Sequence, residues 1–400
     1  MTSIENNLKD IVLNVKVPHI IKGLNIPWPA FKSSFQEWCA QFDNFLTSEE
    51  ILRGGIDFET GNRKHSNIPQ WEKFRGEKKM TVKEFYERSA KGSDFFVDNW
   101  ATYGYKNIKE MPYECAEGFD FGYFGFSEVK DDITFWLSST DAHTPCHFDT
   151  YGCNIVVQVY GRKSWMLFPP NTKLTPTRIP YEESSVYCKE TFFSPEDVTS
   201  YKDVEGDCYT YVLDPGDVLV VPPKWWHYVE NVCPSLSVNA WIPIESDVET
   251  QIEECIVRIL MKNFIEHGKP NDFLDILNPN EIDLSEDKYN LFDILQYLVD
   301  QKSNAGSSPK HKNSYLSENE LSALLVNFNE QIIPVPKISK EEFRNILNQR
   351  IKRFDPAISD NSTLSTESNI KYHLINAVCS PSIINEIKTD FLMKMNKRTS

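Results

Sequence analysis

The stretch "SSTDAHTPCHFDTYGCN", residues 138–154, places His143, His147 and Asp149 close together in a chain that has eight histidines. In a β-strand, side chains at positions i and i+2 point to the same face. His147 and Asp149 would therefore present an imidazole and a carboxylate to one point, and Cys146 would point away from it. Two ligands alone hold a metal poorly, so the pattern predicts a metal site only if a third ligand comes from elsewhere in the chain.

The segment "LDPGDVLVVPPKWWHYVEN", residues 213–231, offers that third ligand. Pro215 and Gly216 are typical of a type II turn, and the Val/Leu run that follows indicates a buried strand. Two prolines end the run, so we expect His227 to come from the end of this second core strand. Two histidines and one carboxylate form the facial triad of non-haem Fe(II) oxygenases, which leaves coordination positions open.

A zinc site is the competing metal hypothesis. His143 and His147 have the i, i+4 spacing that binds zinc when it lies on a helix. Pro145 and the β-like neighbours disfavour a helix here. We therefore interpret His143 as a turn residue near the site, and His147, Asp149 and His227 as the metal ligands.

The fold expected before residue 245 is built from short strands rich in Val, Tyr, Phe and Trp, separated by turn residues. Several such strands indicate a barrel or sandwich. The segments are "DITFWLSS" (132–139), "NIVVQVYG" (154–161), "KSWMLFPP" (163–170), "CYTYVL" (208–213), "DVLVVPP" (217–223) and "LSVNAWIPI" (236–244). Two helices should precede them, over 33–46 with Ser33 or Ser34 as cap, and over 81–90 with a Thr81/Glu84 capping box.

After residue 245 the pattern becomes helical. The segment 247–267 carries apolar residues at helical spacing, and further helices are expected around 287–301, 317–331, 339–353 and 382–396. Two Ser/Asn-rich stretches, near 302–314 and 359–370, indicate flexible connectors. The expected domains are a flexible N-terminus (1–14), a β domain (15–245) and a helical C-terminal region (246–400).

Composition bounds the function class. The formal net charge of -16 and the pI near 5.1 disfavour a nucleic-acid partner, because such a surface repels phosphate backbones. No apolar run approaches the length of about 20 residues that crosses a bilayer, so no membrane association is expected. The nine cysteines include no C-x-x-C pair, which disfavours a disulfide framework and a zinc finger. With no secretory signal in the N-terminal residues, we expect a cytoplasmic or nuclear protein with reduced thiols.

Four blocks together carry a resemblance to a known family. They are "HTPCHFD" (143–149), "YGRKSWMLFPP" (160–170), "PGDVLVVPPKWWH" (215–227) and "SVNAW" (237–241). Over roughly residues 15–245 the chain resembles the JmjC family of 2-oxoglutarate oxygenases. It is most similar to the hydroxylase branch, which contains the asparaginyl hydroxylase of the hypoxia-inducible factor and members associated with a small heat-shock protein. The block "TRIPYEESSVY" (177–187) resembles those heat-shock-associated members. The implied fold class is α+β, a double-stranded β-helix (jelly roll or cupin barrel) with N-terminal helices and a C-terminal helical region.

The resemblance also implies cofactors and residue roles. The cofactors would be Fe(II), on His147, Asp149 and His227, and 2-oxoglutarate. Thr144 and Lys163 fall on residues that hold the distal carboxylate of 2-oxoglutarate, and Asn154 and Asn239 fall on amides that line its pocket. Chemistry agrees for Lys163, since a dianion in an apolar barrel needs a fixed cation. Thr144 fits less well, because strict alternation places its side chain on the opposite face of the strand from His147 unless Pro145 bends the strand.

The family often adds a tyrosine from an earlier strand, and Tyr103, Tyr105 and Tyr123 are the candidates. Trp225, Trp226 and Trp241 are interpreted as core packing.

The implied activity is oxidation by O2 coupled to conversion of 2-oxoglutarate to succinate and CO2, with hydroxylation of a protein side chain as the preferred outcome. A low-turnover protein that uses the same fold to bind a small heat-shock protein in stress response is the alternative. A lysine demethylase or a tRNA hydroxylase is the third possibility. The C-terminal helices could cap the barrel or form a homodimer.

Overall fold

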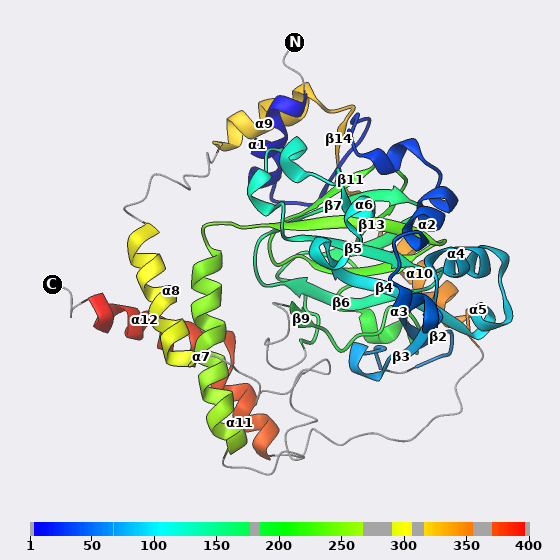
Figure 1. Cartoon of the computed structure of the whole chain (residues 1–400). Helices are drawn as coiled ribbons and strands as arrows, with labels where there is room; N and C mark the ends of the chain where they lie inside the picture. Colours follow the sequence, from blue (N-terminus) through cyan, green and yellow to red (C-terminus); the bar gives the residue numbers. More distant parts are fainter. Residues whose placement is uncertain are drawn as a thin grey trace.

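The computed structural model describes residues 4–66, 68–176, 185–266, 290–305, 316–354 and 370–396. Figure 1 shows a β core with helices on several sides and a separate group of helices, α7, α8, α11 and α12, beside it. The strands are β1 (His19–Ile21), β2 (Ile56–Asn62), β3 (Gly76–Met80), β4 (Asn99–Asn107), β5 (Ile133–Ser138), β6 (His143–Asp149), β7 (Cys153–Tyr160), β8 (Lys163–Phe168), β9 (Ser185–Tyr187), β10 (Tyr209–Leu213), β11 (Val218–Val221), β12 (Trp226–Asn231), β13 (Ser235–Ile242) and β14 (Ile332–Pro334). The α-helices are α1 (Leu8–Asn14), α2 (Phe35–Asp43), α3 (Ser48–Leu52), α4 (Val82–Lys91), α5 (Asp94–Asp98), α6 (Tyr113–Ala116), α7 (Asp247–Glu266), α8 (Leu291–Ala305), α9 (Glu318–Asn327), α10 (Lys340–Ile351), α11 (Ile370–Val378) and α12 (Pro381–Asn396).

The strands form two antiparallel sheets. The larger sheet has the order β14-β1-β11-β7-β13-β5-β4-β2-β3, and the smaller sheet has the order β10-β8-β12-β6-β9. All six strands expected between residues 132 and 244 are present, each within a residue or two of the expected bounds. The expected fold class, a double-stranded β-helix with additional helices, is confirmed.

The origin of His227 differs from the expectation. Pro222 and Pro223 do end β11, and Gly216 has the positive φ of +91° that the preceding turn requires. His227, however, is the second residue of the next strand, β12, and β11 and β12 belong to different sheets. Because proline cannot donate a ladder hydrogen bond, the two prolines mark the point where the chain leaves one sheet and enters the other.

The N-terminus is more ordered than expected. Residues 1–14 were expected to be flexible, but a 3-10 turn (Ile4–Asn7) leads directly into α1. Leu8, Ile11 and Val12 are buried in the main hydrophobic core. Their i, i+3, i+4 spacing is that of an amphipathic helix. Burial of this apolar face stabilises the helix, although the many polar residues of the segment suggested a flexible terminus.

The two helices expected before the barrel are present. Ser34 caps α2 in a reciprocal capping box with Glu37. Thr81 caps α4 by accepting the Glu84 N–H, but the second half of the expected box is missing because the Glu84 carboxylate pairs with Arg88 one turn later.

The C-terminal region divides into two parts rather than forming one helical unit. Helices α7, α8, α11 and α12 share a hydrophobic core of their own. Residues 316–354 instead return to the jelly roll: β14 pairs with β1 at the edge of the larger sheet, and Phe343 and Leu347 of α10 enter the core behind the smaller sheet. Residues 316–354 thus lie in the region expected to be helical, but their apolar residues complete the β core.

The two expected connectors fall largely outside the described residues. Residues 302–305 are the last turn of α8, and 306–314 and 359–369 are not described. Within the described part of the chain, no helix combines the length and apolar character that crossing a membrane requires.

Candidate metal centre

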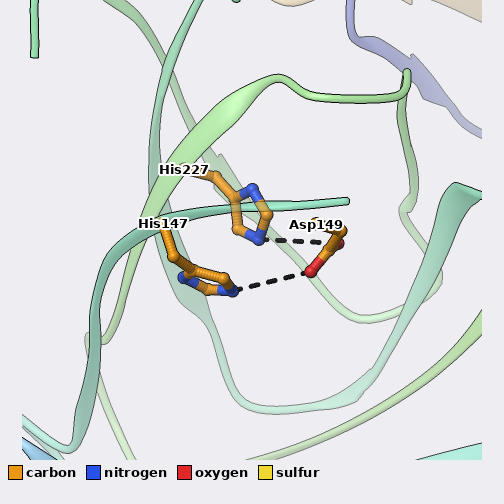
Figure 2. A group of neighbouring side chains, drawn as sticks. All are labelled: His147, Asp149 and His227. Carbon is orange, nitrogen blue, oxygen red and sulfur yellow. Dashed lines mark ion pairs between the residues drawn. The ribbon is translucent and has the colours of Figure 1, made fainter. Parts of the chain in front are cut away.

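Two neighbouring strands bring three potential metal ligands together. Antiparallel pairing of β6 with β12 sets His147 directly opposite His227, and Asp149 follows two residues later on the same face of β6. One ligand atom from each residue lies within 4.8 Å of the other two. Figure 2 shows both imidazoles turned toward the carboxylate, with Nε2 of His147 3.8 Å from Oδ1 and Nε2 of His227 3.9 Å from Oδ2. These separations exceed hydrogen-bond length, so the atoms surround a small space.

Backbone contacts orient both imidazoles. Nδ1 of His147 lies 2.9 Å from the carbonyl oxygen of Pro145, and Nδ1 of His227 lies 2.9 Å from that of Trp225. A carbonyl only accepts, so each Nδ1 carries the proton and Nε2 faces the centre. Burial, with the nearby His227 as a second cause, lowers the pKa of His147 to about 4. A neutral imidazole with its other nitrogen anchored in this way is the usual form of a metal-bound histidine.

Asp149 is held by a network that leaves one oxygen free of hydrogen bonds. Trp241 donates its indole N–H to Oδ2 at 2.9 Å, and Asn154 donates to the same oxygen at 3.2 Å. Asn239 donates to Asn154 and accepts from Trp136. Oδ1 therefore remains directed toward His147.

Trp241 is more than core packing, which corrects the expectation for this residue. Asn154 and Asn239 do line the cavity beside the three ligands, but their amides also orient Asp149. Trp225 and Trp226 are buried in two different hydrophobic clusters, in agreement with a packing role.

A β-bulge decides the position of Thr144. Thr144 pairs with Val229 and His147 pairs with His227, so three steps along β6 correspond to two steps along β12. The extra residue in β6 turns Thr144 onto the same face as His147, where both line the cavity. Strict alternation, which places the two side chains on opposite faces, is broken at this point.

Lys163 is buried and lines the same cavity. Its Nζ donates to Ser237 Oγ at 2.7 Å, and among the described residues no carboxylate lies within 4.0 Å of it. Burial alone lowers the pKa of Lys163 to about 7. A buried ammonium that lacks a protein counter-ion is a suitable partner for an anionic ligand.

His143 and Cys146 do not belong to the metal centre. His143 begins strand β6 instead of lying in a turn, and its ring stacks on Phe193 with centroids 3.9 Å apart. Burial lowers the pKa of His143 to about 4. Because β6 is a strand, His143 and His147 do not share the helical face that the zinc hypothesis needs. Cys146 packs in the core behind the smaller sheet, on the opposite face from His147, as expected.

Of the three candidate tyrosines, Tyr105 lies beside the site. It borders the cavity that continues beyond Thr144 and Lys163, and its ring contacts Trp136 and Trp241. Its positive φ of +56° is rare for a non-glycine residue and is typical of functional positions. Tyr103 packs in the main core, where burial raises its pKa to about 12, and Tyr123 lies near Glu5.

Sequence reasoning missed further residues at the site. Tyr187 stacks on His147 with centroids 5.1 Å apart, and Trp165 leans against His227 at 5.7 Å. Arg75 borders the cavity near Lys163, where it pairs with Glu59 at 2.8 Å. Tyr187 lies in the block 177–187 that carries the family resemblance, although 177–184 lie outside the described residues. Lys163 and Trp165 are two residues apart on one strand and therefore share a face, so the sequence could have placed Trp165 at the site. No sequence pattern marks Arg75.

Comparisons with known proteins give one family match and several similar chains. Residues 5–247 match a family model described as a cupin-like domain. HSPB1-associated protein 1 of Bos taurus is 35% identical over 300 residues, which cover 70% of this chain and 60% of that protein. Lysine-specific demethylase JMJ30 of Arabidopsis thaliana is 31% identical over 131 residues, 32% of this chain and 29% of that protein. The X-ray structure of E. coli ycfD aligns with a TM-score of 0.34 and 12% identity over 78% of this chain and 69% of that chain. The matched region thus spans about 60% of the length of the heat-shock-protein-associated relative.

Proposed function

This chain belongs to the cupin-like JmjC family, and from that premise we propose that it is an Fe(II)- and 2-oxoglutarate-dependent oxygenase that hydroxylates a protein side chain. One observation carries the proposal. The His147–Asp149–His227 cluster lines the same buried cavity as Lys163, which has no carboxylate partner within 4.0 Å among the described residues. A metal site alone would fit many functions. A metal site beside a buried ammonium selects an anionic molecule that reaches from one to the other.

The donor set fits ferrous iron. Two neutral imidazoles and one carboxylate bind iron through three protein atoms and leave positions open for small ligands. When bound, iron and 2-oxoglutarate supply the oxidising chemistry with O2, and succinate and CO2 are the other products. A structural zinc site, by contrast, would require a fourth protein ligand. In the described residues the cluster comprises three.

The chain's own residues supply orientation and exclude water. Trp241 and Asn154 hold the Asp149 carboxylate, and the backbone carbonyls of residues 145 and 225 hold the two imidazoles. Lys163 and Thr144 would bind the distal carboxylate of 2-oxoglutarate by charge and hydroxyl donation. The rings of Trp165 and Tyr187 cover the histidines and keep the site dry.

The partner proposal rests on the relatives. HSPB1-associated protein 1 carries a small heat-shock protein in its name, and we extend that association to this chain as a proposal. A binding protein with little turnover would keep the same fold, but it would not need an intact ligand set beside a buried lysine. A cytoplasmic or nuclear location and a homodimer through the C-terminal helices remain predictions.

Anaerobic spectroscopy tests the cofactors. We expect Fe(II) plus 2-oxoglutarate to give a weak visible charge-transfer band with the wild-type protein, and His147→Ala to abolish it. His373→Ala, at an exposed histidine of α11, is the matched control and should keep the band. A normal band in His147→Ala would refute the ligand assignment, and its absence from the wild type would refute the oxygenase proposal.

Mass spectrometry tests the substrate class. Proteins captured with the wild-type chain should contain peptides that are heavier by one oxygen atom. The same peptides from an Asp149→Ala capture should be unmodified, since that variant lacks the metal carboxylate. If neither modified peptides nor succinate appears with the wild type, the low-turnover binding protein becomes the better reading.

A further inference from the structure

A second and larger cavity lies on the other side of the metal-bearing strands. It has a volume of about 520 Å³ and lies between the smaller sheet and the helices α7 and α12. Figure 1 shows α7 standing beside the β core near β9. A cavity of this size falls in the range that holds a small organic ligand. None of the metal ligands lines it, so it is distinct from the candidate metal centre.

Two aromatic residues adjacent in sequence to the proposed metal ligands, Phe148 and Trp226, line this cavity. Phe148 lies between His147 and Asp149 in β6 and therefore points to the opposite face of the sheet. Its ring meets that of Trp226, the residue before His227, in an edge-to-face contact at 4.6 Å. Leu174, Val186, Val257 and Ile384 add aliphatic walls. The body of any ligand here would be apolar.

The acidic groups of the cavity are already neutralised. Glu253 pairs with Lys388 at 2.5 Å. Burial raises the pKa of Glu254 to about 8, so this carboxyl is largely protonated at neutral pH, and it also accepts a hydrogen bond from the Tyr151 hydroxyl. Neither group would therefore repel an anion strongly.

One cation at the rim has no comparable partner. Lys224 is exposed and lines the cavity, and among the described residues no carboxylate forms an ion pair with it. Asp247 is near enough to feel its charge, but both Asp247 oxygens accept backbone N–H groups, from Gly152 and Ile244. Lys224 also has a left-handed backbone, with φ +63°, which is rare for lysine and fixes its place in the turn before β12.

We propose that this cavity binds an amphiphilic carboxylate, a molecule with an aliphatic body and one anionic end. The aliphatic body lies against Phe148, Trp226 and the aliphatic walls, and the carboxylate lies at the rim beside Lys224. Three threonines, Thr150, Thr172 and Thr250, also line the cavity. This inference does not depend on the proposed oxygenase activity, since it rests on a separate cavity.

Calorimetry with three linear probes tests the proposal on the full chain. Decanoate, decanol and decyltrimethylammonium carry unbranched chains of nine or ten apolar carbons and differ in charge, and each is used below its aggregation concentration. We expect saturable binding of decanoate, about three- to fivefold tighter than decanol, because a rim-exposed ion pair contributes modestly. The cationic probe should bind more weakly than decanol.

Two variants locate the binding. Lys224→Met should weaken decanoate to the affinity of decanol, while the control Lys202→Met, at an exposed lysine outside the lining, should change nothing. Thr250→Trp should occupy part of the cavity and weaken the binding of decanoate and decanol, with circular dichroism to confirm the native fold. Unchanged decanoate binding in a folded Thr250→Trp variant, equal binding of all three probes, or no saturable binding would each overturn the proposal.

Discussion

Removing the guanidinium of Arg350 should destabilise the jelly roll, because this side chain neutralises a buried carboxylate on β12, the strand that carries His227. Glu230 lies in β12, three residues after His227, and is buried. Arg350 reaches it from the end of α10 with Nη2 3.3 Å from Oε2, and Arg353 adds a contact of 2.6 Å to Oε1. Tyr228 donates its hydroxyl to Oε2 at 2.7 Å. The cluster joins helix α10 to the strand that carries His227.

The expected magnitude follows from the burial of both partners. Breaking a buried ion pair by removing one member typically costs about 3–5 kcal/mol, because the remaining charge stays buried. Arg353 would still face Glu230, so we expect the lower end, about 3 kcal/mol, for Arg350→Met. At about 2–4 °C per kcal/mol for a domain of this size, the Tm should fall by about 6–12 °C. Thermal and urea unfolding followed by circular dichroism measure both quantities.

Two further variants separate the ion pair from other effects. Glu230→Met combined with Arg350→Met should recover part of the lost stability, because the buried carboxylate is removed together with Arg350. The recovery is incomplete because Arg353 and the Tyr228 hydroxyl lose their acceptor. Arg344→Met lies on the same helix and removes an ion pair to Glu205, but Arg344 is half exposed, so its Tm should stay near the wild type. If Arg350→Met and Arg344→Met unfold at the same temperature, the reasoning is refuted.

The pH dependence of this effect has a definite sign. Burial opposes ionisation of Glu230, but the charges of Arg350 and Arg353 hold its pKa below the ordinary carboxyl value in the folded protein. A folded pKa below the unfolded one contributes stability that is present above the unfolded pKa and is lost as pH falls through the folded pKa. The difference between the wild type and Arg350→Met should therefore be full at pH 7 and shrink below about pH 4.

Three other predictions follow from the geometry. Binding of 2-oxoglutarate should take up a proton above pH 7, because burial lowers the pKa of Lys163 to about 7 and a bound carboxylate would raise it again. Calorimetry in buffers of different ionisation heat should show this uptake. Above pH 7 the Kd for 2-oxoglutarate should rise by up to about tenfold per pH unit. Trp241→Phe removes a hydrogen bond to Asp149 and should weaken Fe(II) binding by about tenfold in a metal titration, with the Tm nearly unchanged; an unaltered affinity would show that the indole N–H does not orient the carboxylate. Gly161→Ala should destabilise the fold strongly, since φ is +64° and a Cβ would lie 2.1 Å from the Pro234 carbonyl oxygen. Gly216→Ala, with φ +91° and open space around the new Cβ, should lower the free energy of unfolding by only about 1 kcal/mol. Equal unfolding midpoints for the two variants would contradict this.

The sequence by itself determined the strands of the jelly roll and the three residues that we propose as metal ligands. Val- and aromatic-rich runs between Pro and Gly turns mark strands because their periodicity and turn chemistry are local. The pair His147 and Asp149 is equally local, since alternation along one strand fixes their common face. His227 needed the composition of a second segment, and the distance between the two strands came only with the structure.

Tertiary structure decided the features that depend on residues far apart in the chain. The bulge that turns Thr144 inward exists only in the register of β6 against β12. The hydrogen bonds of Trp241 and Asn154 to Asp149, the return of α10 to the smaller sheet and the cavity beneath Phe148 all join separate segments. Periodicity and spacing record which face of an element is apolar. They carry no information about which other element covers that face, because that choice is made by packing across the whole molecule.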